Sequence, residues 1–203
     1  MNPTILIFLK APLLGTVKTR LAKDVGDEAA LEIYRSLVQR QMAAIPPEWP
    51  VEIHFSPPTE EGLMRRWLGE QKEWTFWPQA EGGLGMRLNF AMSEAFSRGA
   101  HAVMLIGGDC PELRRAQFEQ ARDELQSHDV VMGPSLDGGY YLLASDQPRG
   151  ELFENVAWST AEVAPRTREI IAEQGWRHSE LAELGDVDTL ADWEKLRNRI
   201  ETR

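Results

Sequence analysis

Several features are scarce in this 203-residue sequence, and each scarcity excludes a class of protein. There is one cysteine, Cys110, so no disulfide can form within the chain, which excludes the disulfide-framework class. Basic residues number 22 against 32 acidic ones, a formal charge of -10, so we expect no nucleic-acid partner. The longest apolar stretch, Thr4 to Leu9, is too short to span a bilayer, and no signal-peptide pattern is present. We therefore expect a cytoplasmic protein without a membrane partner.

The remaining composition is that of a globular protein. Hydrophobic residues make up 42% and charged residues 27%, enough apolar side chain to bury a full core. No internal repeat, low-complexity tract or long linker divides the chain. We expect a single domain over residues 1–203.

Short apolar runs alternate with segments of helical spacing. The expected strands are bounded by Gly, Pro, Asp or Ser, and they are 5–9, 51–55, 74–77, 102–106 and 130–132. Helical spacing is clearest over 31–45, with Asp27 placed to cap it, and recurs over 84–96 and 118–125, after Pro111. This alternation predicts an α/β fold with helices on both faces of a mostly parallel sheet. Residues 140–144 could add an antiparallel or edge strand, and we expect ligands at the carboxyl ends of the strands.

A basic segment, Lys10 to Lys23, follows the first expected strand. Residues 1–23 contain no acidic residue, although the whole chain is acidic. Gly15 lets backbone approach a ligand, and Lys18 and Arg20 suit phosphate oxygens. The segment is no Walker A loop, because GxxxxGK[ST] is absent. It predicts a phosphate-binding loop, and the alternative is a solvated basic turn.

Aspartates follow two further segments. In IGGDCP, Asp109 ends an apolar strand, where a carboxylate can hold Mg²⁺ or Mn²⁺, and Gly107 and Gly108 leave room for a ligand. In GDVDTLADW, Asp188 is the expected second metal ligand, with Asp186 on the same side of an extended segment. Either Asp109 or Asp188 could instead cap the helix that follows it.

Two glycine-containing stretches are weaker signals. Asp137, Gly138 and Gly139 form a tight turn, which suits either a loop against a sugar or base or an ordinary hairpin. The stretch Gly82 to Gly85 is no GxGxxG fingerprint, which argues against a Rossmann dinucleotide site. Arg87, on the first turn of a helix, could meet an anion or be a surface arginine. Cys110 is expected to pack, and Trp158 to border the site.

Six motifs in order resemble one known family. FLKAPLLGTVKTRLA, EGGLGMRL, IGGDCPEL, MGPSLDGGYYLL, AWST and GDVDTLADW resemble the bacterial DUF2064 family of GT-A-like transferases, named as glycosyltransferases associated with arsenosugar biosynthesis. The family is similar in turn to molybdenum-cofactor and 2-phospholactate guanylyltransferases. IGGDCP departs from those relatives, which commonly have threonine or alanine before the aspartate, and Gly108 leaves more room there. EGGLG replaces their usual glutamine, glycine, aspartate run, so no precise role is carried over to Glu81 or Gly82.

The resemblance implies a three-layer α/β/α nucleotide-diphospho-sugar transferase fold with a mixed sheet. It implies catalytic roles for Lys18, Arg20 and Asp109, with Mg²⁺ or Mn²⁺ held by Asp109 and Asp188. The residues expected to contact the nucleotide or substrate are Lys10, Pro12, Gly15, Lys18, Arg20, Gly85, Arg87, Gly108, Asp137, Gly138 and Gly139.

Three functions are compatible with these residues. The first is a metal-dependent glycosyltransferase that moves a sugar from a nucleotide-sugar to a small-molecule acceptor. The second is a nucleotidyltransferase that joins an NMP to a phosphorylated small molecule and releases pyrophosphate. The third is a catalytically silent nucleotide-binding module. A homodimer is compatible with each, and the base, sugar and acceptor stay open.

Overall fold

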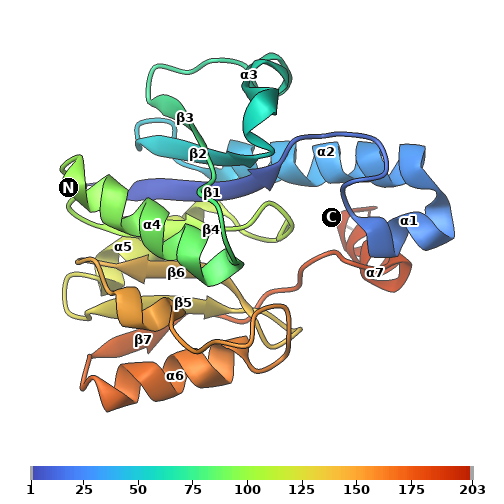
Figure 1. Cartoon of the computed structure of the whole chain (residues 1–203). Helices are drawn as coiled ribbons and strands as arrows, with labels where there is room; N and C mark the ends of the chain where they lie inside the picture. Colours follow the sequence, from blue (N-terminus) through green and yellow to red (C-terminus); the bar gives the residue numbers. More distant parts are fainter. Residues whose placement is uncertain (1, 202–203) are drawn as a thin grey trace.

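The described residues of the computed structural model, 2–201, form one sheet of seven strands between helical layers (Figure 1). Sheet order is β3-β2-β1-β4-β6-β5-β7. Strands β1, β2, β3 and β4 are parallel to their neighbours among these four, β6 runs antiparallel to both β4 and β5, and β5 pairs with β7 in parallel. The strands are β1 (Thr4–Lys10), β2 (Val51–Ser56), β3 (Trp74–Pro78), β4 (Val103–Ile106), β5 (Val130–Pro134), β6 (Tyr140–Ser145) and β7 (His178–Glu180).

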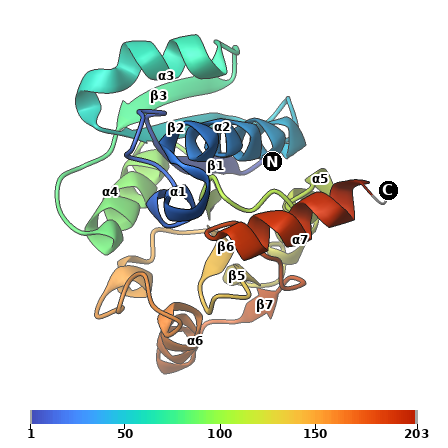
Figure 2. The same cartoon turned by 90° about the vertical axis from the view of Figure 1, so that its right-hand side faces the viewer.

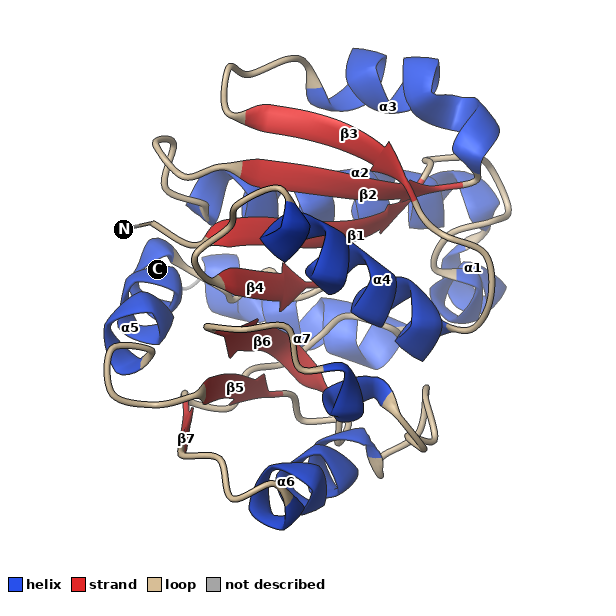
Figure 3. Ribbon diagram, turned by 60° about the vertical axis from the view of Figure 1, so that its left-hand side comes forward, coloured by secondary structure: helices blue, strands red, loops and turns tan. Residues whose placement is uncertain are grey.

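Helices cover both faces of this sheet (Figure 3). They are α1 (Thr19–Val25), α2 (Asp27–Ala44), α3 (Glu61–Leu68), α4 (Leu84–Ser97), α5 (Arg115–Glu124), α6 (Val163–Glu173) and α7 (Leu190–Glu201), with short 3-10 turns at Pro58–Glu60 (η1) and Gly150–Phe153 (η2). Apolar residues of α2, α3 and α5 pack in one core cluster, and those of α4, η2 and α6 pack in a second. The expected three-layer α/β/α architecture and mixed sheet are therefore confirmed.

The sequence of β1 shows why the layers form. Ile5, Ile7 and Leu9 contribute to the first core cluster, whereas Leu6 and Phe8 contribute to the second. Successive side chains of a strand point to opposite faces of a sheet, so an uninterrupted apolar run needs cover on both sides. Burying these side chains, each stabilising by about 1.5–3 kcal/mol, holds the strand at the centre of the sheet.

The structure corrects several boundaries. Asp27 is the first residue of α2 rather than its cap, which is Gly26, and the helix expected near Pro111 begins at Arg115. Helix α1 lies within the segment expected to be a loop, and α3 follows the turn-rich stretch at residue 57. Residues 140–144 form an antiparallel strand in the interior of the sheet, where β6 pairs on both sides.

Two further elements, α6 and β7, were absent from the sequence expectations, as were α1 and α3. Strand β7 has only three residues, HSE, all at least partly exposed, so it carries no apolar signal. Within residues 2–201, none of the helices combines the length and apolar character that crossing a membrane requires.

Candidate functional site

Three distant segments meet at the carboxyl edge of the sheet. The loop after β1 carries Lys18, the loop after β4 carries Asp109, and the segment after β7 carries Asp188. Strands β1 and β4 are neighbours, and the chain leaves β1 toward β2 and β3 on one side before returning to β4 on the other. This is the topological switch point, where open α/β sheets form ligand crevices. Figures 1 and 2 show α1 and α7 brought together at this edge.

Lys18 joins the two aspartates. Its Nζ lies 3.2 Å from Asp109 Oδ2 and 2.9 Å from Asp188 Oδ1. Arg20 Nη1 lies 3.2 Å from the other oxygen of Asp188. The Lys18 side chain is 7% exposed, whereas those of Asp109 and Asp188 are 44% and 35% exposed. The lysine therefore lies beneath the carboxylates, which remain open to solvent.

Local backbone geometry aims these groups. Lys18 is the N-cap of α1 and has a left-handed conformation, with φ 45 and ψ 44, which is uncommon for a residue with a side chain. Such a conformation is retained where the surrounding structure favours it. The backbone N–H of Val187 donates to Asp109 O at 3.1 Å, which ties the segment containing Asp188 to the β4 loop.

The structure does not bear out helix capping by either aspartate side chain. Asp109 caps no helix, because α5 begins at Arg115. At the start of α7, Asp192 Oδ2 accepts hydrogen bonds from the N–H of Thr189 at 2.9 Å and from Thr189 Oγ1 at 2.7 Å. The Asp188 carboxylate contacts Lys18 and Arg20 instead. Both aspartate side chains thus contact the basic segment, and metal binding by them stays a prediction.

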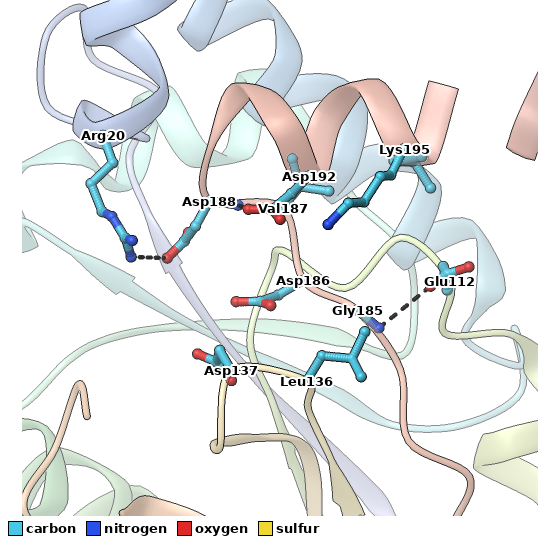
Figure 4. A pocket seen from close by; sticks show the side chains of 11 residues that line it. Arg20, Glu112, Leu136, Asp137, Gly185, Asp186, Val187, Asp188, Asp192 and Lys195 are labelled. Atoms are coloured by element: carbon cyan, nitrogen blue, oxygen red, sulfur yellow. Dashed lines mark hydrogen bonds and ion pairs between the residues drawn. The ribbon is translucent and has the colours of Figure 1, made fainter. Parts of the chain in front are cut away.

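Two adjoining cavities lie beside these residues. The larger, about 500 Å³, has an apolar and aromatic wall that includes Phe8, Leu84, Leu88, Tyr140 and Trp158. The smaller, about 280 Å³, lies against α7 (Figure 4). Both are lined by Arg20, Asp137, Asp186 and Asp188. Their combined lining suits a ligand that is charged at one end and carries a ring at the other.

Acidic side chains dominate the lining. The two cavities are lined by Asp109, Glu112, Asp137, Asp186, Asp188 and Asp192, and by two basic residues, Arg20 and Lys195. Burial and the nearby Asp137 and Asp109 raise the pKa of Asp186 to about 6. For Lys18, burial alone would lower the pKa, but the charges of Asp109 and Asp188 outweigh it and raise the pKa. The site thus holds excess negative charge.

This donor set fits one hard divalent cation. The Lys18 ammonium holds Asp109 and Asp188 side by side. Both carboxylates line the larger cavity and both are partly exposed, so each can offer oxygen to a cation there. Magnesium binds through one or two carboxylates, with water and substrate phosphates completing its shell. Among the described side chains, no set of three or more His, Cys, Asp or Glu forms a metal cage. A cation would therefore share its shell with the substrate.

Other predicted residues lie outside the cavities. The Lys10 side chain is exposed at the end of β1, Pro12 is buried, and Gly15 is exposed with φ 73. Lys18 itself lines neither cavity, because its ammonium is turned to the carboxylates. Arg87 Nε donates to Gly82 O at 2.8 Å, so Arg87 braces the loop before α4. Direct ligand contact by these residues stays a prediction.

Packing accounts for three of the predicted glycines. A methyl group on Gly85 would overlap Trp158, one on Gly108 would overlap Leu9, and one on Gly138 would overlap the Ala161 backbone. Gly138 also has φ 88, which residues with a side chain rarely adopt. By contrast, Gly139 and Asp137 line the larger cavity, as does Trp158.

Sequence reasoning missed the apolar wall. Phe8 and Leu88 read as ordinary core positions, because they lie in a strand and a helix whose periodicity already explains them. Tyr140 follows the Asp137 turn, and its position there was a signal for the site. Leu84, which is 40% exposed at the start of α4, has no sequence signature of its own.

Solved structures share this fold. A crystal structure from Desulfovibrio desulfuricans G20, described as a "putative nucleotide-diphospho-sugar transferase", is 32% identical over 97% of this chain and 87% of that one, with a TM-score of 0.88. CMP:2-keto-3-deoxy-manno-octonic acid synthetase complexed with CTP is 15% identical over 100% and 99%, with a TM-score of 0.61. Rv0371C of Mycobacterium tuberculosis H37Rv, complexed with manganese, is 12% identical over 96% and 98%, with a TM-score of 0.55. The last two show likeness of fold alone.

Sequence comparison defines the family. No curated protein matches the chain. Residues 40–160, more than half of the chain, match the model of a family described as uncharacterised proteins conserved in bacteria. The matched region contains Asp109, the Asp137 turn and Trp158. On this match, and on its 32% identity with the Desulfovibrio protein, the chain belongs to the DUF2064 family.

Proposed function

We propose that this protein is a metal-dependent glycosyltransferase that takes a nucleotide-diphospho-sugar as donor. The observation that carries the proposal is the placement of Asp109 and Asp188, held side by side by Lys18, on the lining of a cavity of about 500 Å³ with an aromatic wall. The carboxylates provide for a cation on the diphosphate, and the wall provides for a ring. The Desulfovibrio protein, similar over nearly the whole chain, supports the same donor class.

The charge of the lining supports a donor of modest charge. Six acidic side chains and two basic ones surround the cavities, so an anionic ligand is repelled unless a cation binds with it. A nucleoside triphosphate carries more negative charge than a nucleotide-diphospho-sugar and needs more compensation. Arg20, 69% exposed at the rim, is free to turn from Asp188 to a phosphate.

The chemistry assigned to the residues follows from their positions. A divalent cation on Asp109 and Asp188 would neutralise the departing diphosphate. Lys18 holds the two carboxylates in place and Arg20 stabilises charge on the phosphates. An acceptor oxygen bonds to the anomeric carbon as the bond from that carbon to the phosphate oxygen breaks. Asp137 and Asp186 line both cavities and are the carboxylates placed to take the acceptor proton.

Donor turnover tests the proposal. Isotope-labelled nucleotide-sugars are incubated with the protein, Mn²⁺ or Mg²⁺ and a panel of small acceptors that includes arsenicals. We expect sugar transfer, or slow release of free sugar, that EDTA abolishes. Asp109→Asn should remove it, and Asp24→Asn, an exposed aspartate in α1, should retain it. Absence of both transfer and hydrolysis across all donors would reject the proposal.

Nucleotidyl transfer is the second candidate, because of the fold. Several solved structures with this fold are nucleotidyltransferases, including the synthetase with CTP. The same residues could serve attack of a phosphorylated acceptor on the α-phosphate of an NTP, with pyrophosphate leaving. Release of pyrophosphate from GTP, CTP or UTP in the presence of a sugar phosphate would favour this candidate over glycosyl transfer.

A further inference from the structure

One group in the larger cavity has no role in the proposed chemistry. Tyr140, the first residue of β6, lines the cavity, and its hydroxyl oxygen is buried with no hydrogen-bond partner among the described residues. Burial raises the pKa of this phenol, so it stays protonated and able to donate a hydrogen bond. A buried hydroxyl without a partner costs stability, and such groups are rare in proteins.

The other two tyrosines of the chain differ. The Tyr141 hydroxyl donates to Ala182 O at 2.9 Å, and the Tyr34 hydroxyl donates to Lys10 O at 2.8 Å. Both therefore have a structural partner. Tyr140 and Tyr141 are adjacent in sequence and their side chains leave opposite faces of β6, so they form a natural pair for comparison.

The surroundings of Tyr140 are apolar. Its ring meets that of Trp158 edge to face, with centroids 6.4 Å apart, and both pack against the core cluster that contains Leu88. Phe8, on the neighbouring part of the cavity wall, packs against the same cluster. A neutral ring can lie against this wall, and the Tyr140 hydroxyl, covered in the free protein, is a hydrogen-bond donor carried by a residue of that wall.

We propose that Tyr140 is a specificity-determining residue whose hydroxyl donates a hydrogen bond to an oxygen on the neutral ring of the substrate. This inference rests on the proposed function, in which that ring is the sugar or the base of the donor. The unpaired hydroxyl of the free protein then gains its partner on binding. A ring that lacks the oxygen leaves the hydroxyl unpaired and binds more weakly.

The segment bearing Trp158 suits such a role. The hydroxyl is covered in the ligand-free protein, so a neighbour must shift for a ligand to reach it. Ser159, next to Trp158, has a positive φ of 64, a conformation uncommon for serine. Strain of this kind gathers at ligand clamps. We infer that this segment adjusts when the ring binds.

Tyr140→Phe tests the inference, and Tyr141→Phe is the control for the unfolding temperature alone, because Tyr141 also lines the larger cavity. Without ligand, Tyr140→Phe should unfold at or above the wild-type temperature, because it removes an unpaired hydroxyl, whereas Tyr141→Phe should unfold at a lower temperature. Binding is measured by titration with Mn²⁺ and UDP-, GDP- or CDP-linked hexoses. We expect about tenfold weaker binding of the preferred compound by Tyr140→Phe.

A second binding measurement identifies which ring of the donor contacts Tyr140. If the loss of affinity persists with the nucleoside diphosphate alone, the base is the partner, and if it occurs only with the sugar-linked compound, the partner is the sugar. Equal affinity of Tyr140→Phe and wild type for every compound would overturn the inference, as would destabilisation matching that of Tyr141→Phe. Metal-dependent turnover retained in that equal-affinity case would leave the proposed function intact, so the two failures are distinguishable.

Discussion

Lys18 and Asp188 are 170 residues apart in the chain, yet the lysine Nζ donates to Asp188 Oδ1 at 2.9 Å. The same ammonium donates to Asp109 Oδ2, so one buried cation holds two carboxylates that would otherwise repel each other. Through this contact the N-terminal basic segment and the C-terminal aspartate become one site.

Loss of the Lys18 charge should destabilise the protein. Lys18→Met removes the balancing cation and leaves Asp109 and Asp188 facing each other. Removing one partner of a buried pair costs about 3–5 kcal/mol, and the partial exposure of both aspartates reduces the expected loss here to about 2 kcal/mol. Urea unfolding in the presence of EDTA measures this loss of stability. Lys23→Met, an exposed change in α1, is the control, and equal stability of the two variants would contradict the prediction.

Nucleotide and metal should stabilise the protein together more than either does alone. A cation that shares its shell between Asp109, Asp188 and a diphosphate binds weakly without the phosphate. A ligand at about 100 times its dissociation constant adds about 2.7 kcal/mol to stability. Thermal unfolding with a nucleotide-sugar, with and without Mn²⁺, measures the increment. It should vanish in Asp188→Asn and persist in Asp24→Asn, and a metal-independent increment would refute shared coordination.

Stability without divalent ions should fall as pH rises through the titration of Asp186. Its folded-state pKa of about 6 lies above the unfolded value, so the folded protein binds more protons between about pH 4 and 6 and loses stability across that window. Asp186→Asn should therefore stabilise the protein above pH 6, by about 1 kcal/mol after allowance for partial exposure. Unfolding at pH 5 and pH 8 in EDTA measures this.

Asp129 should change the stability of the protein with pH in the direction opposite to Asp186. Hydrogen bonds from Arg177 lower the pKa of Asp129 to about 2, so its contribution to stability is present above about pH 4 and is lost as pH falls through 2. Asp129→Asn should destabilise the protein at pH 8, where Asp186→Asn stabilises it. If both variants changed the free energy of unfolding at pH 8 in the same direction, charge crowding at Asp186 would be absent.

The turn at Gly138 should tolerate no side chain. Gly138→Ala combines a positive φ with overlap against the Ala161 backbone, whereas Gly69→Ala has a similar φ of 79 with nothing within 4 Å of the added carbon. Gly69, with ψ -177, lies in a positive-φ region that is essentially restricted to glycine, and a side chain there costs about 1–3 kcal/mol. We expect about that loss for Gly69→Ala and at least about 2 kcal/mol more for Gly138→Ala, measured by urea unfolding. Equal losses would show that Ala161 yields readily.

The sequence alone determined the sheet and the ends of its strands. Apolar runs bounded by glycine, proline or aspartate locate six strands, because a buried strand needs a continuous apolar sequence and its ends need turn residues. The charge anomaly of residues 1–23 and the position of Asp109 indicate the edge of the sheet where we expect ligands to bind. The sequence analysis did not predict the short strand β7 or helix α6, because their stability comes from contacts with neighbouring elements rather than from a local sequence pattern.

Only the tertiary structure decided what the functional groups do to one another. Nothing local in the sequence shows that Lys18 lies beneath Asp109 and Asp188, that Asp192 at the start of α7 leaves Asp188 to the site, or that Tyr140 lacks a partner while Tyr141 has one. Charge balance and hydrogen bonding depend on distances between segments far apart in the chain, and folding alone sets those distances. The basic segment is therefore half of a site whose other half is acidic.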